Sequence, residues 1–247
     1  MRALGKLIAV ELKLFLRDPI TLVFTIILPF LILIVMGEVF GRQAGISEMY
    51  RNVNAMDYYA PAYIGIVMAA VGLVAIPVHL AGYRERGILR RLRASSLSAG
   101  SLFGSQLAVG AVISVVSVIV LMVPAVFIYH ISAPSSITLV LASAALALVT
   151  CCALGAFLGF VLPSARAAQG VGMPLWFFMF MLSGGGPPRG VMTSIMQTVG
   201  KITPQWHITS LMQDAWLGYG WNVGASLVLA GVLAAAAGIT FLVFRRE

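Results

Sequence analysis

The chain alternates between long apolar runs and short polar stretches. Six apolar runs cover residues 20–39, 58–81, 102–129, 137–162, 169–182 and 223–244. About 20 apolar residues in a helix cross the roughly 30 Å of hydrocarbon in a bilayer. Because a backbone in lipid must satisfy its own hydrogen bonds, helices are the expected form of these runs. The pattern predicts an all-α membrane protein with six transmembrane helices, forming one transmembrane domain over residues 1–247.

Residues 1–18, before the first run, have the pattern of an amphipathic helix. Arg2, Lys6, Lys13 and Arg17 share one sector at 100° per residue, and leucines occupy the opposite face. Such a helix lies in the membrane interface. Glu11 points into the middle of the apolar face. Its carboxylate either pairs with an arginine of residues 83–93 or reaches water at the helix rim, and both readings stay open.

Residues 83–95 carry five arginines and one glutamate between two apolar runs. Moving such charges through lipid is costly, so this segment stays in water. Ile88, Leu89 and Leu92 fall on one side of a short helix. A solvated helix with a small apolar face suits docking on another protein. The alternative is a positive-inside loop that only fixes orientation.

Residues 183–219 interrupt the pattern. The sequence from Gly184 to Pro188 (GGGPP) ends a helix, and residues 191–199 and 206–217 have helical character. Thr203 and Pro204 suit a helix start, and Gly218 suits a helix end. Both helices are too short to cross the bilayer, so they are expected to be external and re-entrant, sheltered by protein.

Several residues within the apolar runs predict further features of the fold. Pro29 predicts a kink in the first span. Tyr58, Tyr59 and Tyr63 fit an aromatic belt at the membrane interface. His79, near the inner end of the second span, is expected to be packed or at headgroup level and not a proton relay. The Ala, Gly and Ser residues of 137–162 permit close helix packing.

The basic residues set the orientation. The formal net charge is +8, but the basic residues lie between apolar runs, which indicates a membrane surface and not nucleic acid. With both termini inside, twelve of the sixteen Lys and Arg residues are cytoplasmic, leaving Arg42, Arg51, Arg189 and Lys201 outside. The sequence therefore predicts a multi-pass protein of the cell membrane with both termini in the cytoplasm.

The sequence contains no motif for nucleotide binding, catalysis or metal binding. The chain has no P-loop, nucleophile elbow or zinc-ligand pattern, and the adjacent Cys151 and Cys152 are read as small apolar fillers. We expect no catalytic residue, metal or cofactor in this chain. A stand-alone secondary transporter would need an ionisable residue in mid-membrane, and a membrane-embedded enzyme would need clustered polar residues. Neither is apparent, which favours an external energy source.

Four motifs in order resemble the membrane subunit, or permease, of an ABC-2 type exporter of the drug and antibiotic resistance branch. They are Glu11-Leu12-Lys13 with Arg17-Asp18-Pro19, then Pro29, the Arg84–Ser95 loop (RERGILRRLRAS) and the Ser183–Pro188 break (SGGGPP). The family usually has proline where Ser96 stands. The resemblance covers essentially the whole chain.

The resemblance implies a type V exporter-like fold. Residues 1–18 would be a connecting helix and about 87–93 a cytoplasmic coupling helix. Two permeases, here a homodimer, would work with two ATP-binding cassette ATPase subunits, which bind ATP and magnesium. The residues implied in contact with the ATPase are Glu11, Arg84, Glu85, Arg86, Gly87, Ile88, Leu89, Arg90, Leu92 and Arg93.

The resemblance also places the substrate path between the permeases. Phe177, Phe178, Phe180 and Met181 would lie near an apolar substrate. The alternative is a packed or lipid-facing aromatic stripe. An apolar path suits hydrophobic or amphipathic drugs, antibiotics or lipid-like molecules, and export from the cytoplasm is the direction that the family implies.

Overall fold

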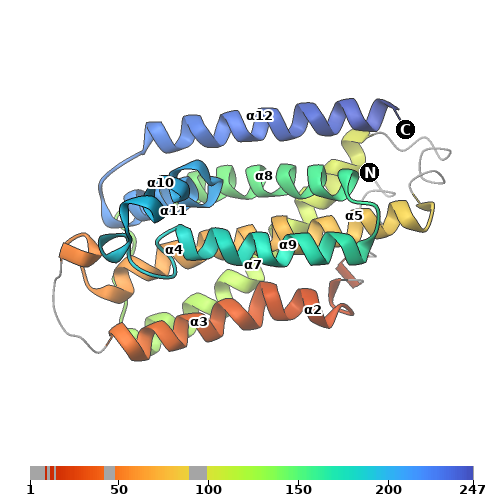
Figure 1. Cartoon of the computed structure of the whole chain (residues 1–247). Coiled ribbons are helices and arrows are strands. Elements are labelled where there is room, and N and C mark those ends of the chain that lie inside the picture. Colours follow the sequence, from red (N-terminus) through yellow and green to blue (C-terminus); the bar gives the residue numbers. More distant parts are fainter. Residues whose placement is uncertain (1–8, 10–11, 14, 42–47, 89–98, 247) are drawn as a thin grey trace.

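The computed structural model describes residues 9, 12–13, 15–41, 48–88 and 99–246, and within these residues the chain is helical without a strand. Long helices lie side by side and run in alternating directions, and the short helices α10 and α11 lie toward one end (Figure 1). Glu11 and the residues from Leu89 to Arg93 lie outside the described residues, so their predicted roles stay predictions. The all-helical class is confirmed.

The helices have the following bounds. The first rod is built from α2 (Pro19–Leu22), a π-helical turn (Val23–Ile27), α3 (Leu28–Met36) and a second π-helical turn (Gly37–Gly41). The second rod is built from α4 (Ala55–Ala70), a π-helical turn (Val71–Ala75) and α5 (Ile76–Glu85). The others are α7 (Ala99–Tyr129), α8 (Ile137–Val161), α9 (Ala165–Leu182), α10 (Ser194–Ile202), α11 (Pro204–Leu217) and α12 (Val223–Arg246), with short 3-10 turns at Glu48–Tyr50 and Arg189–Val191.

Five helical segments in the described part are long and apolar enough to cross a membrane. They are Pro19–Val39, Ala55–Glu85, Phe103–Tyr129, Ile137–Val161 and Val223–Leu242. The second differs from the other four because 89% of its most apolar window is buried inside the protein, against 17–33% for the rest. It contacts α3, α7, α8, α9 and α11 along its length. The rod α4–α5 is therefore the centre of the bundle.

Proline explains the irregular turns of two rods. Pro29 and Pro77 each follow a π-helical turn, Val23–Ile27 and Val71–Ala75 respectively. A proline inside a helix lacks the N–H donor, and its ring collides with the carbonyl four residues earlier. A wider turn before it relieves that collision. The irregularity expected at Pro29 therefore takes the form of a π-helical turn.

Local signals set the helix ends, and those of α11 are the ones that the sequence predicted. Asp18 caps α2 with its side chain, and Ser164 caps α9 by accepting from the backbone N–H of Ala167. Thr203 caps α11 by accepting from Trp206, and Pro204 takes the first helical position. Gly218 ends α11 with φ of 87°, a left-handed conformation that favours glycine.

The tyrosines of the second rod are not at a lipid interface. Tyr58, Tyr59 and Tyr63 are at most 1% exposed and contact one another, Tyr59 and Tyr63 stacking at 5.9 Å between ring centres. The Tyr59 hydroxyl donates to the carbonyl of Gly186 over 3.2 Å. The predicted aromatic belt is therefore wrong, because these rings fill the interface between α4 and the segment after α9.

Glycines allow three helices to meet backbone to backbone at the centre. A Cβ on Gly155 of α8 would overlap the carbonyl oxygen of Gly72. A Cβ on Gly172 of α9 would overlap the carbonyl oxygen of Leu73, one residue along the same π-helical turn. Close packing at the small residues of α8 is confirmed, and α9 joins it at Gly172.

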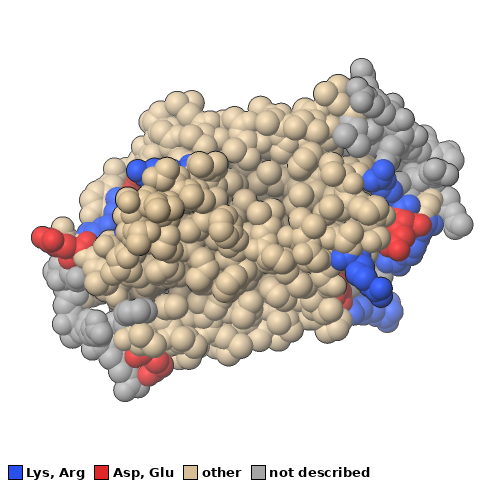
Figure 2. All heavy atoms as spheres, viewed as in Figure 1, with Lys and Arg blue, Asp and Glu red and all other residues tan. Residues whose placement is uncertain are grey.

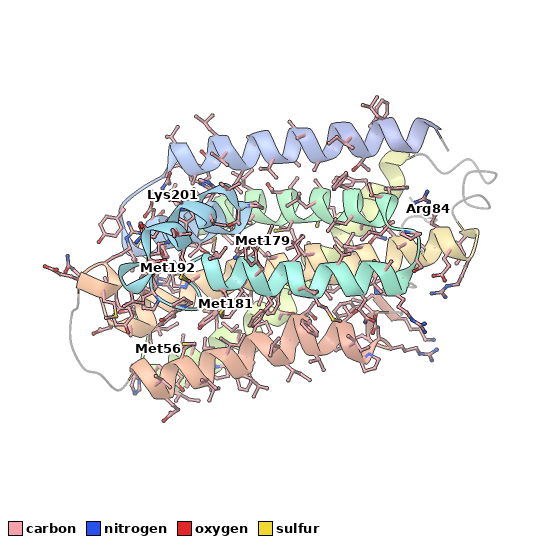
Figure 3. The ribbon with its side chains drawn as sticks, in the orientation of Figure 1. Met56, Arg84, Met179, Met181, Met192 and Lys201 are labelled. Carbon is pink, nitrogen blue, oxygen red and sulfur yellow. The ribbon has the colours of Figure 1, made fainter. Side chains whose placement is uncertain are left out.

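Charge separates the two ends of the bundle. We call the end at which α5 terminates the α5 end, and the end that holds α10 and α11 the cap end. Figure 3 shows Arg84 and Lys201 at these opposite ends. On the face seen in Figure 2, Lys, Arg, Asp and Glu gather toward the two ends and leave the middle uncharged. This distribution matches a bilayer around the middle of the bundle.

We expect Gly172→Ala to lower the free energy of unfolding by about 1–3 kcal/mol, because the added methyl group must displace backbone. Gly170→Ala, on the same helix, is the matched control, since a Cβ there meets nothing within 4 Å. The control should be neutral or stabilising by up to about 1 kcal/mol. Thermal unfolding of both variants in detergent measures the difference. Equal midpoints would show that α9 does not pack this closely.

Candidate functional site

The last turn of α5 carries the first residues of the charged segment. The sequence placed Tyr83 in a separate segment after a span ending at residue 81, whereas α5 continues as a helix to Glu85. Tyr83 is buried against Phe15 and the neighbouring core. Gly87 follows with φ of 67°, which favours glycine, and lets the chain turn away from α5.

Arg84 and Glu85 bind the turn between α8 and α9. The Arg84 guanidinium donates from Nη1 to the carbonyl oxygen of Phe160, in the last turn of α8. Glu85 accepts from the backbone N–H of Ala165, the first residue of α9, over 3.2 Å. Helix C-termini favour cations and N-termini favour anions. The two charges therefore complement the two helix ends, and we call this arrangement the α5 brace.

The described remainder of the charged segment lies beyond the brace. The Arg86 side chain is exposed, whereas Ile88 is half-buried and packs against the cluster that includes Phe15 and Tyr83. Ile88 is therefore held by the chain's own core. Of the apolar residues expected to contact a partner, that leaves Leu89 and Leu92 as candidate anchors.

The structure does not bring together the four residues expected along a substrate path. Phe177 and Phe178 are 53% and 51% exposed on α9, whereas Phe180 is 3% exposed and stacks on Trp176 at 5.9 Å. The Trp176 indole donates in turn to the carbonyl of Ile66, over 3.1 Å. Met181 is partly buried near the cap end of α9 (Figure 3). Phe180 is thus part of the core, and only Phe177 and Phe178 present large apolar surface outward.

Arg189 holds the break after α9 against α11. Its guanidinium donates to the carbonyl of Ser183 over 3.0 Å, to the carbonyl of Trp206 over 2.9 Å and to the Ser210 hydroxyl over 2.9 Å. It also lies 4.0 Å from the centre of the Trp206 ring. Burial lowers the pKa of Arg189 to about 10, so the side chain stays charged at pH 7. No sequence signal beyond its place after the Gly-Pro-Pro break distinguished this arginine.

A second cluster closes the cap end. Arg51 pairs with Asp214 at 2.6 Å and lies over the Tyr219 ring at 4.5 Å. Asn222 donates to the other Asp214 oxygen over 2.6 Å. These contacts tie the segment before α4 to the ends of α11 and α12.

Asp57 makes a further tie at this end. It precedes the apolar run that the sequence shows over residues 58–81, and it lies in the first turn of α4. There it accepts from the backbone N–H and the hydroxyl of Ser132 over 2.7 and 3.0 Å. Because Ser132 follows α7, this carboxylate joins the start of the central rod to the connection between α7 and α8.

Uncharged polar groups are buried between α4 and α11. Gln213 donates to the carbonyl of Tyr58 over 3.0 Å, while the side-chain atoms of Gln205, Thr209 and the Tyr63 hydroxyl have no hydrogen-bond partner among the described residues. Polar groups left unpaired in a core cost about 1–3 kcal/mol each. This seam is therefore a place where water or a polar ligand group would be stabilised.

These features define a multi-pass α-helical membrane protein whose charged groups lie at its two ends. A family model described as ABC-2 type transporter matches residues 2–217, most of the chain. The chain belongs to the ABC-2 type transporter family, as the sequence resemblance indicated. Membrane domains of this family are permease subunits, for which a separate ABC ATPase hydrolyses ATP. A comparison with curated proteins finds no match.

We expect Arg189→Ala to destabilise the cap end by about 2 kcal/mol or more, because hydrogen bonds to a charged group and a cation–π contact are lost together. Arg189→Lys should recover only part of the lost stability, since the ammonium of lysine is not planar and cannot stack on the Trp206 ring as the guanidinium does. Lys201→Ala, which removes an exposed cation from the adjacent α10, is the control. Thermal unfolding of the three variants measures these differences in stability. Equal stability of the alanine and lysine variants would contradict a role for the fork.

Proposed function

We propose that this chain is the permease subunit of an ATP-driven exporter that moves a hydrophobic or amphipathic substrate out of the cytoplasm. Two copies of the permease work with two ATP-binding subunits, which hold ATP and magnesium. The observation that carries the proposal is the α5 brace. It joins the charged segment to three helices at once, so a force applied to the segment reaches α5, α8 and α9 together.

The distribution of charge supports an external energy source. The five long apolar segments carry Asp, Glu, Lys or Arg only near their ends, such as Glu38, Asp57, Arg84 and Glu85. A carrier driven by protons or ions would use an ionisable group near mid-membrane. ATP hydrolysis on a docked subunit needs no such group, which favours the permease over the stand-alone transporter.

Helix α9 supplies the sixth span. It has 18 residues, about 27 Å at 1.5 Å per residue, close to the thickness of the hydrocarbon core. Its first turns carry Arg166 and Gln169, which lower its mean hydropathy, while its other end carries Trp176 and Phe180. Six passes place both chain ends at the α5 end. The excess of basic residues there makes this end cytoplasmic.

The cap end is then extracellular, and α11 is re-entrant. Helix α11 has 14 residues, about 21 Å, and contacts α4, α8 and α12 along a largely buried surface. Its burial in protein satisfies the requirement for a helix that enters the bilayer without crossing it.

The orientation is tested by single cysteines in a Cys151→Ala, Cys152→Ala background, both native thiols being buried and free. Ser194→Cys, exposed on α10, should react with an impermeant maleimide added to intact cells. Arg166→Cys, exposed at the start of α9, should react only after the membrane is opened. Labelling of position 166 in intact cells would reverse the proposed orientation.

Docking of the ATP-binding subunit is tested at Leu89 and Leu92. A few central apolar anchors dominate small interfaces, so Leu89→Asp or Leu92→Asp should lose the co-purified ATPase and abolish export. Arg90→Ala should have little effect, because an exposed charge contributes about 0–1 kcal/mol. The variants must still insert and stay dimeric, which size-exclusion chromatography establishes. If the ATPase still co-purifies normally with both leucines replaced, the segment is a loop that only fixes the orientation of the chain in the membrane.

The substrate surface is proposed on the outer side of α9. Phe177 and Phe178 are exposed on a helix whose opposite side packs on the central rod, so they face either lipid or a second permease. A path between two copies would be lined by these rings, which suits apolar drugs, antibiotics or lipid-like molecules.

A further inference from the structure

A cavity lies at the α5 end, between the segment that precedes α2 and the last turns of α5. Its volume is about 320 Å³, far more than a single water molecule requires. The polar side chains along it are Arg17, Asp18, His79, Tyr83 and Arg86. The cavity also borders Ala165, the first residue of α9, whose backbone N–H donates to Glu85, so it lies next to the α5 brace.

The acidic group of this cavity is already bound. The Asp18 carboxylate accepts from the backbone N–H groups of Ile20 and Thr21 over 3.2 and 3.3 Å, and from the Thr21 hydroxyl over 2.6 Å. These bonds cap α2 and occupy both oxygens. Within the described part of the chain, neither Arg17 nor Arg86 forms an ion pair with a carboxylate. Two guanidinium groups against one carboxylate therefore leave the lining of the cavity with an excess of positive charge.

The neutral lining is also suited to an anion. The Nε2 atom of His79 is buried and has no hydrogen-bond partner among the described residues. His79 also borders a second, much smaller cavity with Gln106. The Tyr83 side chain borders the larger cavity beside it. Its remaining walls include Pro19 and Val78, which are apolar.

We propose that this cavity binds a phosphate group, supplied by the headgroup of an anionic lipid or by free phosphate. Guanidinium groups match the oxygens of phosphate in planar, charge-assisted pairs. The cavity lies where the first rod begins and the second ends, which is headgroup depth for a bundle spanning the bilayer. Pro19 and Val78 then face the glycerol and upper acyl chain of a bound lipid. An occupied site ties the N-terminal segment to α5.

The test uses the purified full-length permease without any ATP-binding subunit, so its outcome is independent of the proposed transport function. Native mass spectrometry and thermal unfolding are compared in phosphatidylglycerol and in phosphatidylcholine. The Arg17→Gln, Arg86→Gln double variant removes both guanidinium groups. The Lys13→Gln, Arg166→Gln double variant is the control, because it removes two exposed cations outside the cavity. All four side chains are exposed, so folding should persist, which monodisperse elution confirms.

We expect the wild type to retain phosphatidylglycerol and to unfold at higher temperature in it than in phosphatidylcholine. The cavity variant should bind this lipid about thirtyfold more weakly, as expected for two lost basic contacts, while the control stays close to wild type. Inorganic phosphate added in phosphatidylcholine distinguishes the sources: equal protection, lost in the cavity variant, identifies free phosphate as the ligand. Equal losses in both variants, or no response to lipid or phosphate, would overturn the proposal.

Discussion

Helices surrounded by lipid gain little by hiding apolar side chains from one another, so their association depends on how closely the backbones approach. In this protein the closest approach is at one level of the central rod. Gly155 of α8 meets the carbonyl of Gly72, and Gly172 of α9 meets that of Leu73. Both contacts fall on the π-helical turn Val71–Ala75. The positions of α8 and α9 therefore depend on one irregular turn of α4–α5.

The two ends of the bundle use charge differently. At the cap end, Arg51 and Asp214 pair with each other, and Arg189 is enclosed by carbonyl groups and the Trp206 ring. At the α5 end, Arg84 and Glu85 are bound to helix termini, while Arg86 is exposed. A cap built from internally matched charges is self-contained. The α5 end retains cations for molecules outside the chain, which suits an end that meets partners and the lipid surface.

Local signals in the sequence predicted the helices and their ends, because hydropathy, caps and prolines act over a few residues. Thr203, Pro204 and Gly218 all act as the sequence predicted. Which side chains contact protein and which contact lipid could not be predicted in this way. An apolar ring such as that of Phe180 is about as stable against lipid as against protein, so apolar character does not tell which of the two it contacts. Likewise, no local pattern shows that Arg84 and Glu85 meet the ends of two helices distant in sequence.

The α5 brace and the glycine contacts together determine how the bundle can respond to a push on the charged segment. The brace fixes the ends of α8 and α9 to the last turn of α5. The glycines fix the same two helices to the turn Val71–Ala75, which precedes α5. Between these two points, α5, α8 and α9 are held as one body, since close-packed interiors transmit displacement and deform little. Under the proposed function, a push on the segment would therefore displace α5, α8 and α9 together, and α8 and α9 would carry that displacement to α10, α11 and α12, which they contact.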